Sequence, residues 1–304
     1  MRVAILTGAS SGMGFAVARR LGQEGYTLIV NSRDPSQAVK RLEAEGWKVI
    51  GVPGDLAEAS TAEALVGTAE RMGRLDALLL NHGGPPVKPL LEIPEEEWRR
   101  YFELMVVGPL RLLRLAVPLF RRSGGGRVVA ITSFTVKSPY PGIGLSNSLR
   151  AALLNALKTA ALELGREGIL VNAVAPGYIL TERIAEWNRA YAAREGVTEE
   201  EIARRTTEGI PLGRYGKPEE VAEVVAFLLS SRNGYLTGQQ VLVDGGWWWP
   251  TKGVRNDLGH GGTHALGSFV VACLHRREHL PARVAEARPP PDGAIGRPGV
   301  CGLP

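Results

Sequence analysis

Short apolar runs alternate along the chain with longer stretches in which apolar residues recur at helical spacing. The apolar runs are continuous, as expected of strands that are buried on both faces of a sheet. The expected strands cover residues 3–6, 27–30, 49–52, 77–80, 127–131, 170–174 and 240–243. The expected helices cover 12–24, 35–45, 57–72, 95–122, 145–165 and 218–229.

This alternation predicts an α/β fold of the Rossmann type, with helices covering both faces of a doubly wound parallel sheet in three layers. Such a sheet binds ligands beyond the carboxyl ends of its strands. Residues 178–216 interrupt the rhythm with a polar, helix-prone segment after the sixth strand. We interpret this segment as a substrate lid above the ligand crevice. A plain surface insertion is the alternative.

The alternation stops after Trp249, so we predict one domain over residues 1–249 and a C-terminal extension over 250–304. The extension contains Arg288-Pro-Pro-Pro and scattered glycines, which predict a loop-rich or disordered segment. No apolar run approaches the roughly 18 residues that span a bilayer. The opening residues lead directly into a functional-looking turn, so we expect neither a membrane segment nor a signal peptide.

Composition narrows the function classes. The chain is 44% hydrophobic and 22% charged with a net charge of +5, which is ordinary for a soluble globular protein. No basic patch with interleaved aromatic residues appears, so we expect no nucleic-acid partner. Both cysteines and four of the five histidines follow residue 250. Residues 1–250 therefore offer no thiol nucleophile, disulfide or His/Cys metal site, which fits a cytoplasmic protein.

A glycine-rich turn between Thr7 and Gly14 joins the first expected strand to the first expected helix. One glycine permits a tight turn, another lets the backbone approach a pyrophosphate, and a third lets the helix pack against the sheet. The helix N-terminus adds free N–H groups and a partial positive charge for the anion. The turn therefore predicts a dinucleotide site that includes Gly8, Ser10, Ser11, Gly12, Met13 and Gly14.

The second expected strand ends at Asn31-Ser32-Arg33. NAD-binding proteins usually place an acidic residue here for the ribose 2′-hydroxyl, and this chain has none until Asp34. An arginine here suits a 2′-phosphate. Ser32 and Arg33 therefore favour NADP(H) over NAD(H), with a solvated surface arginine as the alternative.

With these motifs in view, residues 1–247 resemble the short-chain dehydrogenase/reductase family, most closely its branch of 3-oxoacyl-acyl-carrier-protein reductases. The resemblance rests on the Thr7–Gly14 turn, Asp55-Leu56, Asn81-His-Gly-Gly, Ser133, Pro176-Gly177 with Thr181, Pro211-Leu-Gly-Arg, Thr237-Gly238 and Asp244-Gly-Gly. It implies hydride transfer between NAD(P)(H) and a carbonyl or alcohol substrate. It further implies cofactor contacts from Asp55 and Leu56 to adenine, from Asn81 and Gly83 to ribose, and from Pro176, Gly177, Ile179 and Thr181 around the nicotinamide.

The sequence departs from the family pattern at the catalytic positions. Ser133 matches the catalytic serine, but Ser146 stands thirteen residues later, where the family has tyrosine, and Arg150 stands in place of lysine. Met105 replaces an asparagine. A serine hydroxyl is much less acidic than a tyrosine hydroxyl. Arg150 stays protonated, so it cannot relay protons, but it can donate hydrogen bonds to ribose hydroxyls and hold positive charge near an oxyanion.

We predict catalytic roles for Ser133, Ser146 and Arg150, with Arg150 also contacting the cofactor. Alternatives remain for two of these roles. Ser146 could instead cap the long helix, and Arg150 could hold the cofactor without a catalytic role. Tyr140 is an alternative source of the proton. Tyr178 is expected to line the pocket. His82 is able to titrate near neutral pH, but a packing role is the favoured interpretation.

At the level of the whole protein, the alternative to an enzyme is a dinucleotide-binding module with a structural or sensory role. The changes at Met105, Ser146 and Arg150 motivate it. The helices expected at 95–122 and 145–165 resemble those that pair between subunits in the family, so we expect a homotetramer.

Overall fold

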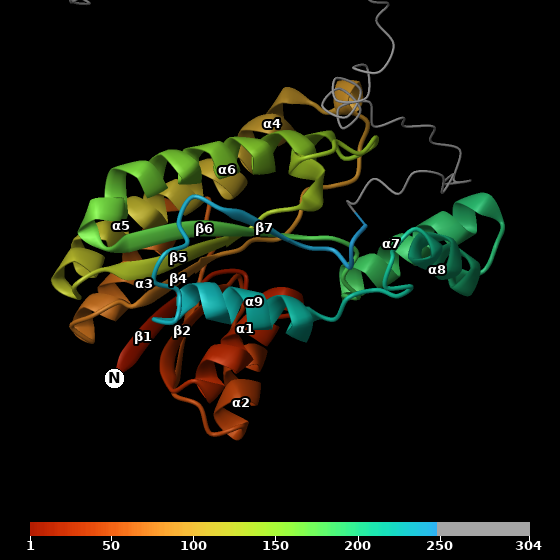
Figure 1. Cartoon of the computed structure of the whole chain (residues 1–304). Coiled ribbons are helices and arrows are strands. Elements are labelled where there is room, and N and C mark those ends of the chain that lie inside the picture. The colour runs from red at the N-terminus through yellow and green to blue at the C-terminus, as the bar shows by residue number, and fades with distance from the viewer. Residues whose placement is uncertain (248–304) are drawn as a thin grey trace, which may run out of the picture. The chain divides into compact units, whose positions relative to one another are not determined.

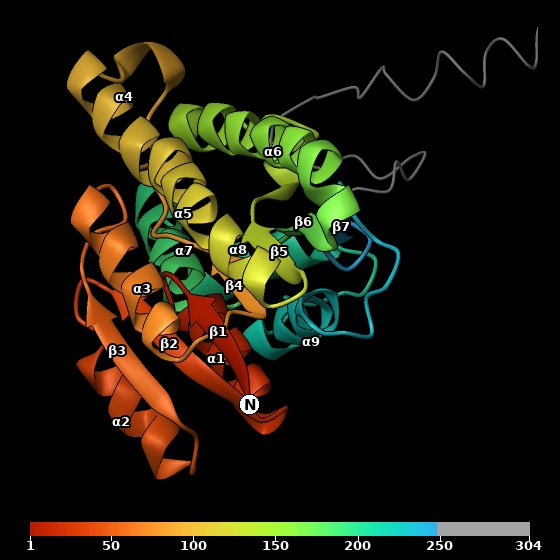
Figure 2. The same ribbon diagram turned by 90° about the vertical axis from the view of Figure 1, so that its left-hand side faces the viewer.

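The computed structural model describes residues 1–247 (Figures 1 and 2). Seven parallel strands form one sheet in the order β3-β2-β1-β4-β5-β6-β7. They are β1 (Arg2–Leu6), β2 (Tyr26–Ser32), β3 (Val49–Pro53), β4 (Ala77–Leu80), β5 (Gly126–Ile131), β6 (Ile169–Pro176) and β7 (Gln240–Val243). The strand order reverses between β1 and β4, so the ligand crevice is expected above these two strands. The predicted Rossmann-type fold is confirmed, and the predicted extension over 250–304 lies outside the described residues.

Helices cover both faces of the sheet (Figure 1). One face packs against α1 (Gly12–Gln23), α2 (Ser36–Ala44) and α9 (Pro218–Leu229), and the other against α3 (Ala59–Arg71), α5 (Gly108–Arg122) and α6 (Gly144–Leu164). Alternate residues of each strand point to opposite faces, so Ile5 belongs to one apolar core whereas Ala4 and Leu6 belong to the other. The short 3₁₀ helices are η1 (Leu90–Glu92), η3 (Phe134–Val136) and η4 (Gly165–Glu167).

Helices α1 and α9 lie against each other although about 200 residues separate them in the chain. The Arg20 Nε donates a hydrogen bond to the Glu223 Oε1 at 2.7 Å. The Tyr26 hydroxyl, at the start of β2, donates to the Leu229 carbonyl at the end of α9 at 3.3 Å. Helix α1, which follows the glycine-rich turn, is therefore held in place by α9, the last helix of residues 1–247.

The expected single helix over 95–122 is interrupted. Its first part is α4 (Glu95–Phe102), its second part is α5, and a π-helical turn, η2 (Glu103–Val107), joins them. The turn places Met105 in a small apolar cluster with Val106, Leu145 and Leu149, the last two from the neighbouring helix α6, and Met105 is fully buried. A π-helical turn adds one residue to a helix and leaves the helix equally hydrophobic. The pattern of apolar residues therefore did not indicate the interruption at 103–107.

Residues 178–216, the lid segment, contain α7 (Glu182–Glu195) and α8 (Glu199–Glu208). The two ends of this segment are joined, because the Leu180 N–H donates to the Gly216 carbonyl at 2.8 Å and the Gly216 N–H donates to the Tyr178 carbonyl at 3.0 Å. The segment is helical as expected, and its role as a lid stays a prediction. Of the helices within residues 1–247, none has the length and apolar character of a membrane span.

Candidate active site

The glycine-rich turn follows β1 and has little room for side chains. Gly8 and Gly12 have φ values of +58° and +53°, which favour glycine. A Cβ atom on Gly14 would lie 2.2 Å from the Gly8 carbonyl oxygen, so no other residue fits there without movement. Ser11 is the N-cap of α1 and makes no side-chain hydrogen bond to the helix. The first N–H groups of α1 are therefore available to an anion.

Asn81 braces this turn. Its amide Nδ2 donates to the Gly8 carbonyl at 2.8 Å, and its backbone N–H donates to the Thr7 Oγ1 at 2.9 Å. The Thr7 hydroxyl in turn donates to the Asn81 carbonyl at 2.7 Å. These bonds tie the ends of β1 and β4 together at the point where the strand order reverses. The implied contact of Asn81 with the cofactor ribose stays a prediction.

A cavity of about 450 Å³ lies at the end of β2, lined by Ser10, Ser32, Arg33 and Asp34. The Ser32 hydroxyl is buried and has no hydrogen-bond partner. Arg33 is exposed, and no ion pair is found for it among the described residues. The Asp34 carboxylate accepts a hydrogen bond from the Ser36 N–H at 2.9 Å, and its bonds to Ser36 lower the pKa of Asp34. The cavity thus has an unpaired donor and an unpaired cation.

Asp55 and Leu56 follow β3, beside this cavity. The Gly54 N–H donates to the Ser32 carbonyl at 3.0 Å, which holds the end of β3 against the end of β2. The Asp55 Oδ1 accepts from the Ala57 N–H at 3.0 Å, and Leu56 is buried. Both residues therefore follow the edge strand β3, and their adenine contacts stay a prediction.

Arg150 contacts Ser146 on α6 and also joins α6 to the end of β5, where the chain leads into Ser133. The Arg150 Nε donates to the Ser146 Oγ at 3.1 Å, and the Arg150 Nη1 donates to the Ile131 and Thr132 carbonyls, each at 3.0 Å. The Ser133 Oγ accepts from the backbone N–H of Thr135 at 3.1 Å and from its hydroxyl at 3.0 Å.

Helix α6 begins at Gly144, with Ile143 as its N-cap, so Ser146 lies inside the first turn. The alternative that Ser146 serves as the helix cap is therefore wrong. Positions 146 and 150 instead share one face of the helix, where their side chains make the hydrogen bond described above.

Two nitrogen groups near this cluster have shifted pKa values. Burial and the nearby Arg183 guanidinium lower the pKa of Arg150 to about 10, so Arg150 remains a cation at neutral pH. Burial and the charge of Arg150 lower the pKa of His82 to about 3. His82 is therefore neutral near pH 7. Its Nδ1 lies 2.9 Å from the Gly83 carbonyl oxygen, and its buried Nε2 has no hydrogen-bond partner.

Aromatic side chains from the sheet edge and the lid segment form a cluster next to Ser133. The Phe134 ring lies 4.7 Å from Trp247 and 5.7 Å from Tyr178, measured between ring centroids. Tyr178 is also near Trp187 and Tyr215. Burial raises the pKa of Tyr178, so its hydroxyl is a poor proton donor. This cluster gives the predicted pocket residue Tyr178 a largely apolar setting.

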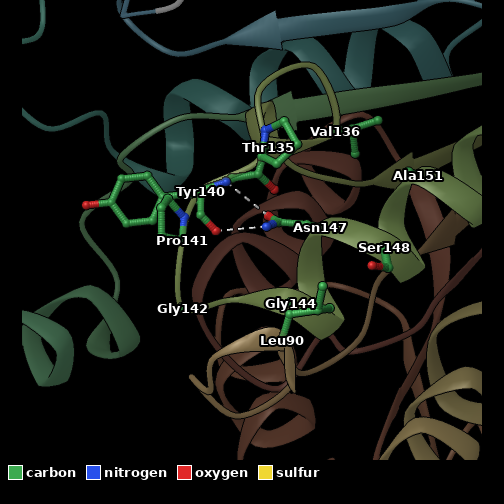
Figure 3. A pocket seen from close by; sticks show the side chains of 11 residues that line it. Leu90, Thr135, Val136, Tyr140, Pro141, Gly142, Gly144, Asn147, Ser148 and Ala151 are labelled. Atoms are coloured by element: carbon green, nitrogen blue, oxygen red, sulfur yellow. Dashed lines mark hydrogen bonds between the residues drawn. The ribbon is translucent and has the colours of Figure 1, made fainter. Parts of the chain in front are cut away.

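The loop that carries Tyr140 lines a second cavity of about 470 Å³, shown in Figure 3. The Asn147 Nδ2 donates to the Tyr140 carbonyl at 2.8 Å, while the Tyr140 ring points away from the cavity (Figure 3). Gly144, Asn147, Ser148 and Ala151 line it, at helical spacing. They present a different face of α6 from Ser146 and Arg150, so this cavity lies away from those two side chains.

The residues predicted to contact the nicotinamide lie at the end of β6 and before α7. The Gly177 N–H donates to the Val243 carbonyl at 2.9 Å, which fixes the Pro176-Gly177 turn. Ile179 is buried, and Thr181 is the N-cap of α7 without a side-chain hydrogen bond to the helix. The methyl group of Thr181 would lie 3.6 Å from a Cβ on Gly12, so α7 begins beside the glycine-rich turn.

Arg183, two residues after Thr181, was not among the site residues predicted from sequence motifs. Its Nη2 donates to the Pro85 carbonyl at 2.6 Å, and its guanidinium lies directly against Gly84. It is an exposed arginine in a polar helical segment, so no pattern distinguished it from the other arginines of α7. Within residues 1–247, no group of three or more His, Cys, Asp or Glu side chains is placed to hold a metal ion.

Comparisons with known proteins place the chain among known reductases and dehydrogenases. A family model described as "Enoyl-(Acyl carrier protein) reductase" matches residues 8–248. The Bos taurus protein "Dehydrogenase/reductase SDR family member 4" is 36% identical over 250 residues, which cover 81% of this chain and 86% of the relative.

Two solved structures resemble the chain closely in fold. L-sorbose reductase from Gluconobacter frateurii, complexed with NADPH and L-sorbose, has a TM-score of 0.78 and 30% identity and covers 82% of this chain and 97% of its own. A single-site variant of actinorhodin polyketide ketoreductase with NADPH has a TM-score of 0.76 and 34% identity, covering 81% and 97%. Both are reductases with a nicotinamide dinucleotide.

Proposed function

Because the chain belongs to the short-chain dehydrogenase/reductase family, we propose that its cofactor is NADP(H) and that Ser146 and Arg150 replace the usual tyrosine and lysine. As a member of this family, the chain is a nicotinamide-dependent oxidoreductase of CH–OH and C=O groups. The cavity at the end of β2 supports the choice of NADP(H). There, within residues 1–247, the buried Ser32 hydroxyl lacks a hydrogen-bond partner and the Arg33 cation lacks a counterion, which together suit a 2′-phosphate.

The residues of the chain fit this cofactor. The close approach of Gly14 to Gly8 leaves a backbone cradle that a Cβ would fill, and the free N–H groups at the start of α1 face it. When bound, the nicotinamide supplies or accepts a hydride at the substrate carbon. Asp55 and Leu56 would contact the adenine, Gly83 would line the cofactor ribose, and Gly177, Ile179 and Thr181 would hold the nicotinamide half.

Ser133 and Ser146 both have a hydrogen to donate toward a substrate oxygen. The Ser146 Oγ accepts from Arg150, and the Ser133 Oγ accepts from two donors of Thr135, so the hydroxyl hydrogen of each serine is left free. The Arg150 cation stabilises negative charge on Ser146 or on a substrate alkoxide. Ser146 thus delivers the proton to the developing alkoxide, and Ser133 fixes the carbonyl oxygen.

Binding measurements with both cofactors test the choice of NADP(H). Arg33→Leu should raise the Kd for NADPH about 10- to 100-fold, as expected for loss of a charge-assisted phosphate contact, and leave the Kd for NADH unchanged. Lys48→Leu is the matched control, because Lys48 is an exposed cation at the opposite end of the sheet from this cavity. Equal effects of Arg33→Leu on both cofactors would argue against a 2′-phosphate site.

The departures at Ser146 and Arg150 favour one second candidate, a dinucleotide-binding module with a structural or sensory role. A panel of ketones and alcohols separates the two functions. The enzyme proposal requires turnover of at least one carbonyl compound with NADPH. Micromolar NADPH binding without turnover of any substrate would favour the binding module.

We further propose a cytoplasmic homotetramer that acts on a small carbonyl compound with an apolar body. The aromatic cluster around Tyr178 supports the apolar substrate. Exposed apolar side chains on α4 and α6, among them Phe102 and Leu162, support association through these helices.

A further inference from the structure

Two guanidinium groups near the ends of β4 and β5 have no carboxylate partner within residues 1–247. Arg150 donates only to carbonyl oxygens and to Ser146, and Arg183 donates to the Pro85 carbonyl. Among the described residues, neither forms an ion pair. The two are also close enough for the charge of Arg183 to act on Arg150. Two cations without a counterion create a positive potential that favours binding of an anion in the crevice.

The position of Arg183 indicates which anion this is. Thr181, the N-cap of α7, lies beside Gly12 of the glycine-rich turn, where α1 presents its free N–H groups. From the first turn of α7, Arg183 reaches across to Gly84 and Pro85, which follow β4. Its side chain therefore spans the crevice from the lid segment to the loop after β4, over the point where strand order reverses. In this fold the pyrophosphate lies at that point.

We propose that Arg183 is a cofactor-binding residue of the lid segment, which clamps the dinucleotide pyrophosphate against the glycine-rich turn. This rests on the proposed function only in requiring a bound dinucleotide. Arg183 is exposed as a residue and its guanidinium donates to a single carbonyl, so exchange of the Pro85 contact for phosphate oxygens breaks only one hydrogen bond. Binding of the phosphates would then fix the first turn of α7 and order the lid segment over the substrate.

Equilibrium binding of NADPH, NADH and ADP-ribose tests the clamp, because all three contain the pyrophosphate and ADP-ribose lacks the nicotinamide. Arg183→Leu should raise the Kd for all three about 10- to 100-fold. Arg183→Lys should lose less, since lysine keeps the charge but not the planar fork. Arg189→Leu removes an exposed arginine from the same helix and should change none of the three. Circular dichroism and thermal unfolding of each variant establish that it is folded.

Hydrogen exchange of α7 and α8 gives a second measurement. In the wild type, NADPH should slow exchange in these helices, and in Arg183→Leu it should not do so even at saturating NADPH. Unchanged Kd values in Arg183→Leu, or a loss confined to an anionic substrate, would overturn the clamp and leave the dinucleotide function intact. Failure of the wild type to bind any of the three ligands would instead contradict the proposed function itself.

Discussion

At the residue scale, the proposed chemistry depends on the hydroxyl of Ser146. The substitution Ser146→Ala should lower kcat about 100-fold or more, because the general acid is lost, while the Kd for NADPH stays within about two-fold. Steady-state kinetics and binding measurements on this variant check both expectations. Ser148→Ala is the matched control, because Ser148 is exposed and lines the separate cavity on another face of α6. Unchanged kcat in Ser146→Ala, together with loss in Tyr140→Phe, would transfer the role to Tyr140.

His82 leads to a prediction about acid stability. Its pKa is about 3 in the folded protein, compared with about 6.5 when unfolded, so between these pH values the unfolded chain binds more protons. The free energy of unfolding should therefore fall as the pH drops from about 6.5 toward 3, by up to ~1.4 kcal/mol per pH unit from this group. Its contribution is fully present above pH 6.5.

Denaturant titrations at several pH values measure this slope in the wild type and in His82→Gln. The variant has a side chain of similar size that does not titrate, so its stability should fall less steeply over the same range. The same slope in both proteins would contradict the assignment of His82 as a buried neutral group.

At the element scale, the π-helical turn η2 places an apolar residue where the family pattern has asparagine. Met105→Asn restores the family residue, but its amide would enter the cluster of Val106, Leu145 and Leu149 without an identified partner. We expect a loss of about 2–4 kcal/mol in the free energy of unfolding and no gain in kcat. Met105→Leu, which conserves the apolar character, should lose less than about 1.5 kcal/mol. A variant Met105→Asn as stable as the wild type would indicate space for water at this turn.

Some helices, strands and site contacts could be predicted from the sequence and others could not. The seven strands were predictable because buried parallel strands are continuous apolar runs bounded by polar residues, as at Ala77–Leu80. The turn η2 was not, because it changes only the phase of an apolar helix pattern. At the site, the contact between Ser146 and Arg150 followed from their spacing of four residues. Arg183 was not predictable, because its partners follow β4, about 100 residues earlier, and only the fold brings them together.

At the scale of the whole molecule, the proposed homotetramer predicts a solution mass four times that of the 32.6 kDa chain. Leu162 is 85% exposed on α6, and Phe102 is 44% exposed on α4. Leu162→Arg and Phe102→Arg should therefore lower the mass measured by light scattering, because a charge would be buried in the contact. Leu212→Arg, which changes an exposed leucine of the lid segment, is the control and should keep the tetramer. A monomeric wild type would refute the proposal.

The packing of α1 against α9 has a consequence for how the protein is made. During synthesis the glycine-rich turn emerges about 200 residues before α9, so α1 acquires its partner only after Pro218–Leu229 has been translated. Pairing of β1 with β4 likewise waits for a strand that follows about 70 residues later. Such distant contacts slow folding. A nascent chain should therefore be unable to capture its nucleotide until nearly the whole domain has left the ribosome, and nucleotide binding would report that folding is finished.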